Sequence, residues 1–349
     1  MNKYQSKKLL YIICNLLFIN LVINSMGFTQ QLNKVAGNRQ LNSKKWSKMR
    51  TLNSIFLIIL LPFVLLNCLN RKEYNGIGFA GEPAWGSNNQ IAFIYTPFKI
   101  INNDTIWIED SSGLWIIESD GSKMQLLKVG NYDEPYWSSD CQWIACSDLI
   151  GKLWRINIKN KTANQIFVPI RAWCPNFTPD GQKIIFATPD SSQFGQGGIY
   201  KITLGDSIPR LIFPYGSKPN VSPDDTMLVF LGWIWMNNEW MGGIIVSDSI
   251  GNNARIILYL EQQYADNPTF SPDRSKICFD TGGADPEVWI INSDGNGLRK
   301  IIENGRMPVF SPDGEKIVYQ RWSFLWGLSD QGKLWIVNID GSNNHQLTF

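Results

Sequence analysis

The sequence predicts an all-β fold, a six-bladed β-propeller built from four-stranded antiparallel blades. Three observations support this prediction. A segment resembling Pro-x-aromatic-Ser-Pro-Asp-Gly occurs six times, and its first prolines lie 52, 40, 44, 49 and 40 residues apart. Each copy is followed by a short apolar run and then by a stretch of alternating character. A repeat of about 40–50 residues that contains several short strands is typical of propellers.

Each unit is expected to begin with an inner strand, strand A, which ends in a tight turn. The clearest copy is the segment that starts at Pro308 and reads Pro-Val-Phe-Ser-Pro-Asp-Gly. In such a turn proline restricts φ, the aspartate side chain accepts hydrogen bonds from backbone N–H groups, and glycine tolerates positive φ. On this pattern the six blades start near residues 82, 134, 174, 218, 267 and 307.

Three further strands follow in each unit. Strand B is a short apolar run such as 183–186, and strand C alternates between apolar and polar residues, as in 288–292. A second turn, often Asp-Gly, leads to strand D, as in 346–349. Because every unit runs from strand A to strand D, we expect the ring to close by packing of blade 6 on blade 1. A strand exchange is not required, although residues 74–80 could supply one.

Residues 1–67 are interpreted as an export segment. They contain two apolar runs, 9–28 and 52–66, with nine Lys or Arg and no acidic residue. The second run is shorter than the roughly 20 residues of a membrane span, and a two-helix hairpin would oppose the positive-inside bias. A start at Met49 makes 52–66 the apolar part of a signal peptide and 1–48 an upstream extension. A plain signal peptide or single anchor, and a two-helix membrane protein, remain alternatives.

The end of this segment resembles the lipobox of bacterial lipoproteins, since Leu65-Leu66-Asn67 precedes Cys68. Asn67 departs from the small residue that usually stands before the cysteine. The resemblance implies lipid attachment at Cys68 and a location in the cell envelope, on the periplasmic side, with the membrane as one partner. Residues 68–81 are then a linker, and the propeller spans 82–349.

The charge of the remaining chain argues against a nucleic-acid partner. Removing the nine basic residues of 1–67 from the chain's 32 Lys and Arg leaves 23 against 30 acidic residues, a net charge of about −7. A protein that binds nucleic acid needs a basic face to neutralise phosphates. The pI of about 8.1 therefore reflects the export segment rather than the propeller.

The repeat units resemble the WD40-like (PD40-type) repeats of TolB-like propellers. The resemblance is carried by Phe310-Ser-Pro-Asp-Gly-Glu-Lys-Ile-Val and, 24 residues after Phe310, by Leu334-Trp-Ile-Val-Asn-Ile-Asp-Gly-Ser-Asn. It covers 82–349 and implies a propeller scaffold with a binding role. About 14 residues separate Cys68 from the first blade, so the additional N-terminal domain of TolB has no counterpart. One propeller fold serves many functions, so contacts like those of TolB do not follow from the repeat.

No residue pattern indicates catalysis, a cofactor or a metal. The single histidine, His345, is expected in an outer strand, and no Gly-x-Ser-x-Gly motif is present. The turn aspartates occupy one equivalent position per blade, which fits turn capping better than a metal site. The four cysteines of the propeller lack Cys-x-x-Cys spacing, so we expect no zinc, and a disulfide among them stays open. They are Cys141, Cys146, Cys174 and Cys278.

Aromatic residues that the repeat does not require are concentrated in the connections between strands B and C. They are expected to form a binding face, because interfaces are enriched in Trp, Tyr, Met and Arg. In the competing interpretation the same rings pack on one another or plug the axial channel. The candidate binding residues, from blades 1, 4 and 6, are Phe98, Trp107, Trp233, Trp235, Trp240, Trp322, Phe324 and Trp326.

The sequence therefore predicts a non-enzymatic binding protein of the cell envelope that recognises a protein partner through this aromatic face. The alternative is a propeller that binds carbohydrate or peptidoglycan, or a degenerate glycan-active enzyme, because tryptophan rings also stack on sugars.

Overall fold

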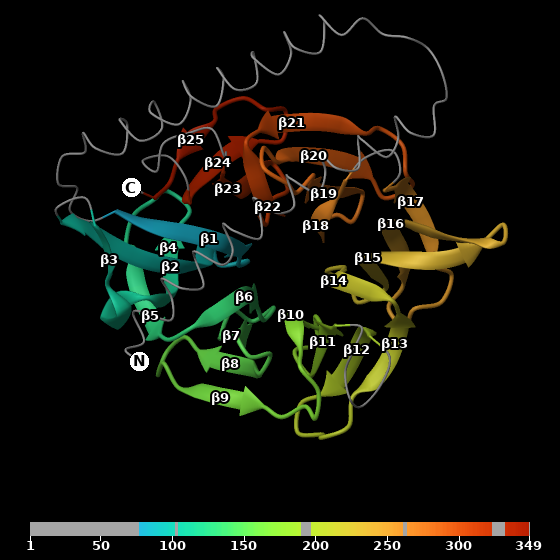
Figure 1. Cartoon of the computed structure of the whole chain (residues 1–349), viewed down its shortest axis with the longest axis horizontal. Coiled ribbons are helices and arrows are strands. Elements are labelled where there is room, and N and C mark those ends of the chain that lie inside the picture. Colours follow the sequence, from blue (N-terminus) through green and yellow to red (C-terminus); the bar gives the residue numbers. More distant parts are fainter. Residues whose placement is uncertain (1–76, 102–103, 190–196, 261–263, 323–331, 349) are drawn as a thin grey trace, which may run out of the picture. The chain divides into compact units, whose positions relative to one another are not determined.

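The computed structural model describes residues 77–101, 104–189, 197–260, 264–322 and 332–348. These residues form a six-bladed β-propeller, in which the blades follow one another around a ring in chain order (Figure 1). The predicted fold class is confirmed. The export segment 1–67, with its proposed start at Met49 and lipid site at Cys68, lies outside the described residues. No helix in the described ranges is long and apolar enough to cross a membrane.

Every blade is an antiparallel meander in which strands A, B, C and D lie side by side in chain order. Blade 1 comprises β1 (Ile77–Trp85), β2 (Gln90–Ile101), β4 (Gly113–Glu118) and β5 (Gln125–Val129), and blade 2 comprises β6 (Tyr132–Trp137), β7 (Trp143–Asp148), β8 (Leu153–Asn157) and β9 (Ala163–Ile166). Blade 3 comprises β10 (Trp173–Phe177), β11 (Lys183–Thr188), β12 (Gly198–Thr203) and β13 (Arg210–Pro214), and blade 4 comprises β14 (Gly216–Val221), β15 (Met227–Met236), β16 (Glu239–Asp248) and β17 (Arg255–Tyr259). Blade 5 comprises β18 (Asp266–Phe270), β19 (Lys276–Asp280), β20 (Glu287–Asn292) and β21 (Arg299–Glu303), and blade 6 comprises β22 (Gly305–Phe310), β23 (Lys316–Arg321), β24 (Lys333–Asn338) and β25 (His345–Gln346).

Among the described residues, two blades carry additional structure between strands B and C. In blade 1, β3 (Asp104–Trp107) pairs with the end of β2 and is followed by a single 3-10 turn, η1 (Glu109–Ser111). In blade 4, β15 and β16 extend as a hairpin whose turn residues Asn237 and Asn238 both have positive φ, the geometry of a tight two-residue hairpin turn. Strand β1 begins at Ile77, so residues 77–81, expected in the linker, belong to blade 1.

The turns after strand A have the chemistry that the sequence predicted. In blade 6 the Ser311 hydroxyl hydrogen-bonds the Asp313 carboxylate, which also accepts the N–H of Glu315 at 3.0 Å. The same pattern recurs in blade 5, where Asp273 pairs with Ser271. The aspartates therefore cap turns, as expected from their equivalent positions.

The hydrophobic core lies between the blades rather than at the axis. Each cluster of buried side chains combines two consecutive blades; Val229 and Ile244 of blade 4, for example, pack against Phe270 and Phe279 of blade 5. The cluster that joins blades 6 and 1 contains Phe93 and Leu334 among others. Blades 6 and 1 share no strand among the described residues, so the ring closes by packing of one blade on the other. A hydrogen bond from Gln320 Nε2 to the Ala80 carbonyl, at 2.8 Å, supports this closure.

Candidate ligand-binding site

Strand A of every blade contains a β-bulge with an unusual backbone conformation. The residue before the first proline is not glycine, yet its φ lies between 50° and 55° in all six blades. The pairing of strand A with strand B shifts register at the same point. A non-glycine residue in the left-handed region is strained, and the following proline disfavours it further. The six pre-proline residues are Glu82, Glu134, Cys174, Lys218, Asn267 and Met307.

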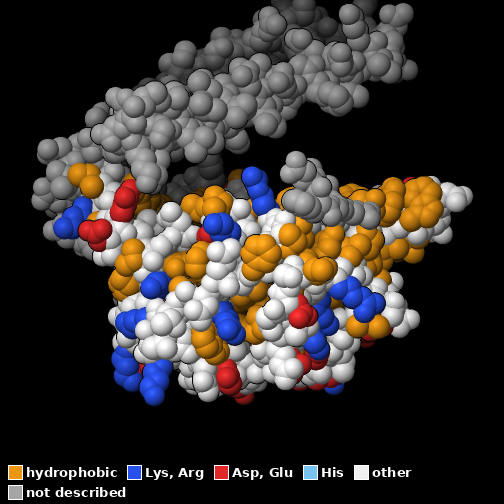
Figure 2. Space-filling model, turned by 90° about the horizontal axis from the view of Figure 1, so that it is seen from below, with side chains coloured by type: hydrophobic (Ala, Val, Ile, Leu, Met, Phe, Trp, Pro, Cys, Tyr) orange, Lys and Arg blue, Asp and Glu red, His pale blue; other side chains and the backbone are white. Residues whose placement is uncertain are grey.

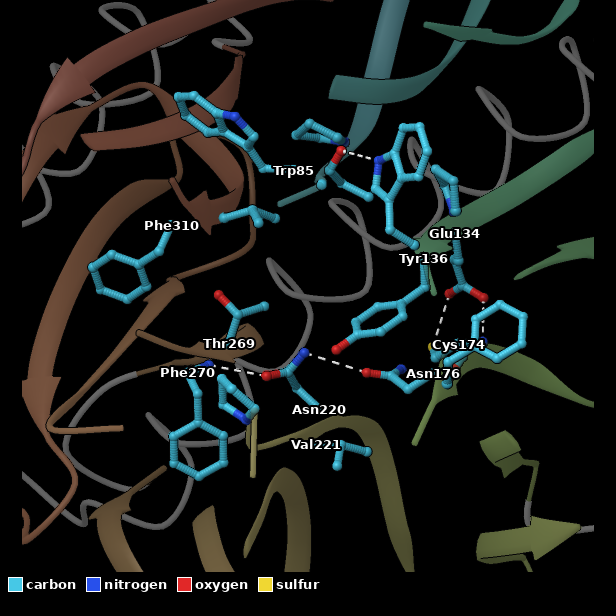
Figure 3. A pocket seen from close by; sticks show the side chains of 18 of the residues that line it. Trp85, Glu134, Tyr136, Cys174, Asn176, Asn220, Val221, Thr269, Phe270 and Phe310 are labelled. Atoms are coloured by element: carbon cyan, nitrogen blue, oxygen red, sulfur yellow. Dashed lines mark hydrogen bonds between the residues drawn. The ribbon is translucent and has the colours of Figure 1, made fainter. Parts of the chain in front are cut away.

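These pre-proline residues surround an axial cavity of about 410 Å³. Its wall is formed by strand A of all six blades, and it extends to the turns after strand A, where Ser139 and Pro223 are among the lining residues. We call the end of the disc formed by these turns the A–B face. Figure 3 shows side chains from different blades converging on this space. The volume lies within the range of roughly 300–1,000 Å³ that is usual for ligand sites.

In two blades a glutamate carboxylate accepts a hydrogen bond from the backbone N–H of the bulge residue in the next blade. The N–H of Glu134 donates to Glu82 Oε2 at 2.5 Å, and the N–H of Cys174 donates to Glu134 Oε2 at 2.5 Å. Glu134 Oε1 also accepts the Cys174 thiol at 2.9 Å and Lys218 Nζ at 3.1 Å. The bulges leave these backbone N–H groups without a ladder partner, and a buried N–H needs one. The glutamates therefore stabilise the bulges while they line the cavity.

Burial and neighbouring charges shift the pKa values of Glu82, Glu134 and Cys174 in different ways. Burial, together with the negative charge of Asp133, raises the pKa of Glu82 to about 8. Burial would also raise the pKa of Glu134, but Lys218 and the hydrogen bonds from Cys174 outweigh it and hold that pKa below its usual value. Burial raises the pKa of the Cys174 thiol. At neutral pH the cavity therefore presents a protonated Glu82, a Glu134–Lys218 ion pair and a neutral thiol.

The wall nearer the A–B face has one polar side, formed by blades 2 to 5. Asn220 Nδ2 donates to Asn176 Oδ1 at 3.2 Å, and Asn220 Oδ1 accepts the N–H of Phe270 at 2.9 Å, as Figure 3 shows. Tyr136 also hydrogen-bonds Asn220, and burial raises the pKa of its phenol to about 12. Val309 of blade 6 contributes apolar surface to the wall. The cavity thus offers amide and hydroxyl groups on one side and hydrocarbon on the other.

The aromatic residues predicted as a binding face have different environments. Phe98 is 2% exposed, because it lies in β2 and packs against Trp107 with ring centroids 5.2 Å apart. Its predicted role as a contact residue is wrong: β3 folds back on β2 and covers this ring. Trp107 itself is 44% exposed. Trp322 is half-buried, with the Arg306 guanidinium 5.2 Å from its ring. Phe324 and Trp326 lie outside the described residues.

The three tryptophans of blade 4 are about half exposed on the β15–β16 hairpin. Trp235 and Trp240 are cross-strand neighbours with ring centroids 5.6 Å apart, and Tyr215 lies 5.2 Å from Trp240. Trp233 and Trp240 border a second cavity of about 450 Å³ together with Tyr215 and Ser217. Figure 1 shows that this hairpin and β3 lie on opposite sides of the ring. The aromatic groups therefore do not form one continuous cluster.

Sequence reasoning missed the axial cavity. A signal was present, because three of the six residues before the repeat prolines are charged, namely Glu82, Glu134 and Lys218. Solvated loops are rich in charge, so the pattern alone does not show that these side chains converge. All four described cysteines are free thiols.

Comparison with solved structures places the fold. The chain is similar to a putative TolB from Agrobacterium tumefaciens, with 20% identity and a TM-score of 0.54 over 64% of this chain and 84% of that one. It is also similar to TolB from Acinetobacter baumannii, with 16% identity and a TM-score of 0.53 over 76% and 77% of the two chains. The chain has a TolB-like propeller fold.

An enzyme is also among the similar structures. A gluconolactonase from Xanthomonas campestris shares 13% identity, with a TM-score of 0.51 over 75% of this chain and 86% of that one. No protein-family model and no curated protein sequence matches the chain. At these identities the likeness to TolB and to the lactonase concerns the fold, and function has to be argued from the site.

Proposed function

We propose that the protein is a non-enzymatic, envelope-associated binding protein whose axial cavity receives a segment of a protein partner. The observation that carries this proposal is the cavity of about 410 Å³ into which all six blades project their strand A residues. The export-like N-terminal segment supports the envelope location. The earlier prediction of a protein partner on the aromatic B–C connections stays a prediction, and the cavity is the better-formed site.

The wall chemistry favours a peptide segment. Peptide groups alternate N–H donors and C=O acceptors, and the amides of Asn176 and Asn220 keep hydrogen-bonding capacity beyond the bonds that they already make. The apolar side, which includes Val309, can receive a hydrophobic side chain. An aromatic or aliphatic anchor in a desolvated pocket is the usual energetic centre of such an interface.

The state of the ionisable groups favours binding over catalysis. A nucleophilic cysteine needs a lowered pKa, whereas burial raises that of Cys174, and its thiol donates to Glu134. Glu134 is itself held in an ion pair with Lys218. The single histidine of the chain, His345, is exposed in β25 at the outer edge of blade 6.

The proposed test uses a substitution that narrows the cavity and leaves its ionisable residues unchanged. Val309→Phe adds a ring to the partly buried wall of the channel, while Val129→Phe makes the same change at a valine that is 47% exposed and outside the cavity. Each variant, as the full chain in mild detergent, is used to capture proteins from envelope extract. We expect Val309→Phe to reduce recovery of the partner by about tenfold or more and Val129→Phe to leave it unchanged.

A folded Val309→Phe protein that recovers the partner as the wild type does would refute the proposal. A glycan array probed with the same proteins covers the carbohydrate alternative. Glycan binding that Val309→Phe abolishes would keep the cavity as the site and replace the peptide by a saccharide.

A further inference from the structure

The exposed hydrophobic residues of the propeller are concentrated on one face. We define the B–C face as the end of the disc formed by the B–C connections together with the connections from strand D to the next strand A. Of the fifteen large hydrophobic side chains exposed in the described ranges, eleven lie on this face or at its rim. They are Ile106, Trp107, Val129, Leu149, Ile150, Phe167, Tyr215, Trp233, Trp235, Trp240 and Tyr264.

These residues come from different parts of the ring rather than from one patch. Blade 1 supplies Trp107, blade 2 supplies Ile150, and Tyr264 stands between blades 4 and 5. Figure 2 shows hydrophobic side chains along the upper part of the disc and on the projection at its right-hand end, where Figure 1 shows β15 and β16. Apolar residues that extend along one face from blade 1 to the connection between blades 4 and 5 suit an extended apolar phase better than one compact partner. Six of the eleven are Trp or Tyr, the residues enriched at membrane–water interfaces.

The chain also enters the propeller from this face. Ile77, the first described residue, pairs with Phe98 at the end of β1 that is far from the A–B turn. The preceding segment contains the apolar run 52–66 and Cys68, and eight residues, 69–76, lie between Cys68 and Ile77. The nine Cα–Cα steps from Cys68 to Ile77 span at most about 30 Å. A membrane anchor in that segment would therefore hold the propeller close to the bilayer with the B–C face nearest to it.

The opposite face is less suited to lipid than the B–C face, because it has few of the exposed hydrophobic side chains to offset its carboxylates, whereas Glu109, Asp110 and Glu239 of the B–C face stand among exposed aromatic rings. Its turns carry aspartates in most blades, and hydrogen bonds from Ser271 and Ser275 lower the pKa of Asp273 to about 2. Hydrogen bonds from Ser311 and from the Glu315 N–H likewise lower the pKa of Asp313. Ionised carboxylates are repelled by the negative surface potential of anionic lipids and are strongly hydrated.

We propose that the B–C face of the propeller lies on a lipid bilayer, with its exposed Trp, Tyr and aliphatic side chains at the boundary of headgroups and acyl chains. Apolar residues that bind in this way lie about 5–10 Å into that boundary. The proposal does not depend on what the axial cavity binds, but it shares the export-like N-terminal segment with the proposed envelope location. It places the A–B face, where the axial cavity ends, on the side away from the membrane.

The experiment measures whether tryptophans of this face reach the acyl chains. The full chain is reconstituted in phosphatidylcholine vesicles with or without bromine atoms on the acyl chains, which quench nearby tryptophan fluorescence. We expect quenching of the wild type, and a reduction of the quenched emission by about half when Trp233, Trp235 and Trp240 are all replaced by Phe. The Phe rings keep the surface apolar, so the triple variant should stay on the membrane. It should lack only the tryptophan fluorescence that the brominated acyl chains quench in the wild type.

A matched pair of variants tests the orientation. Ile150 on the B–C face and Ile250 on the opposite face are 62% and 58% exposed, each in a turn between two strands. Ile150→Asp should lower the quenching of the blade 4 tryptophans, and Ile250→Asp should leave it unchanged.

Absence of quenching in the wild type, or unchanged quenching in the triple Phe variant, would overturn the proposal. Equal effects of Ile150→Asp and Ile250→Asp would overturn it as well. A face that docks a protein instead would give no quenching in vesicles of pure lipid, so that outcome also counts against the membrane.

Discussion

The Glu82 carboxyl should make the propeller less stable as the pH rises, and Glu82→Gln should remove this effect. The Glu82 side chain accepts the Glu134 N–H and hydrogen-bonds Asp133, which is the arrangement of a protonated carboxyl beside a carboxylate. A glutamine at this position reproduces it, because its amide oxygen can accept from Glu134 and its NH₂ can donate to Asp133.

The magnitude follows from the difference between the folded and unfolded pKa. Burial raises the folded-state pKa of Glu82 to about 8 from an ordinary value of 4.5. The folded state therefore binds this proton more tightly than the unfolded chain. Its stabilising effect is complete below about pH 4.5 and is lost as the pH rises through about 8. At about 1.4 kcal/mol per pH unit, ionisation of Glu82 costs the folded wild type roughly 3–5 kcal/mol above pH 8.

The assay is urea unfolding of the full chain in mild detergent, followed by tryptophan fluorescence at pH 5, 7 and 8.5. We expect the free energy of unfolding of Glu82→Gln to match the wild type at pH 5 and to exceed it by about 3 kcal/mol at pH 8.5. Glu315→Gln, at an exposed glutamate of a turn, is the control and should show no such pH dependence. A difference that does not change with pH, or a Glu82→Gln protein that is less stable at pH 8.5, would refute the reasoning.

Three further predictions concern packing, charge and thiols. Lys218→Met leaves Glu134 without its cation and should lower the free energy of unfolding by about 3 kcal/mol, a loss that Glu134→Gln added to it should partly restore in thermal melts. Trp289→Ala removes a ring that packs between blades 4 and 5 and should cost about 3 kcal/mol, whereas Trp235→Ala, at a ring that is 55% exposed, should cost under 1 kcal/mol in the same melts. The four described cysteines are free, so a reducing agent should leave the melting temperature unchanged; a drop would reveal a disulfide.

The fold could be predicted from the sequence because its information is local and repeated. The spacing of the prolines sets the number of blades, and the Ser-Pro-Asp-Gly chemistry of segments such as 311–314 places the turn after strand A. Closure by packing follows from the order of strands within the repeat. Each of these features is a short local motif or the repetition of that motif along the chain, so a single sequence reveals them.

Only the tertiary structure shows the site, because its residues meet across blades. Glu134 reaches Cys174 and Lys218, which are 40 and 84 residues further along the chain, and the ring geometry brings them together. The sequence shows that loop aromatics exceed what the repeat needs, but not which of them are covered. Phe98 is buried because β3 folds back over it, and Trp235 is exposed because β15 and β16 extend beyond the blade. Exposure depends on how a segment packs after folding, and a repeat pattern contains no information about that.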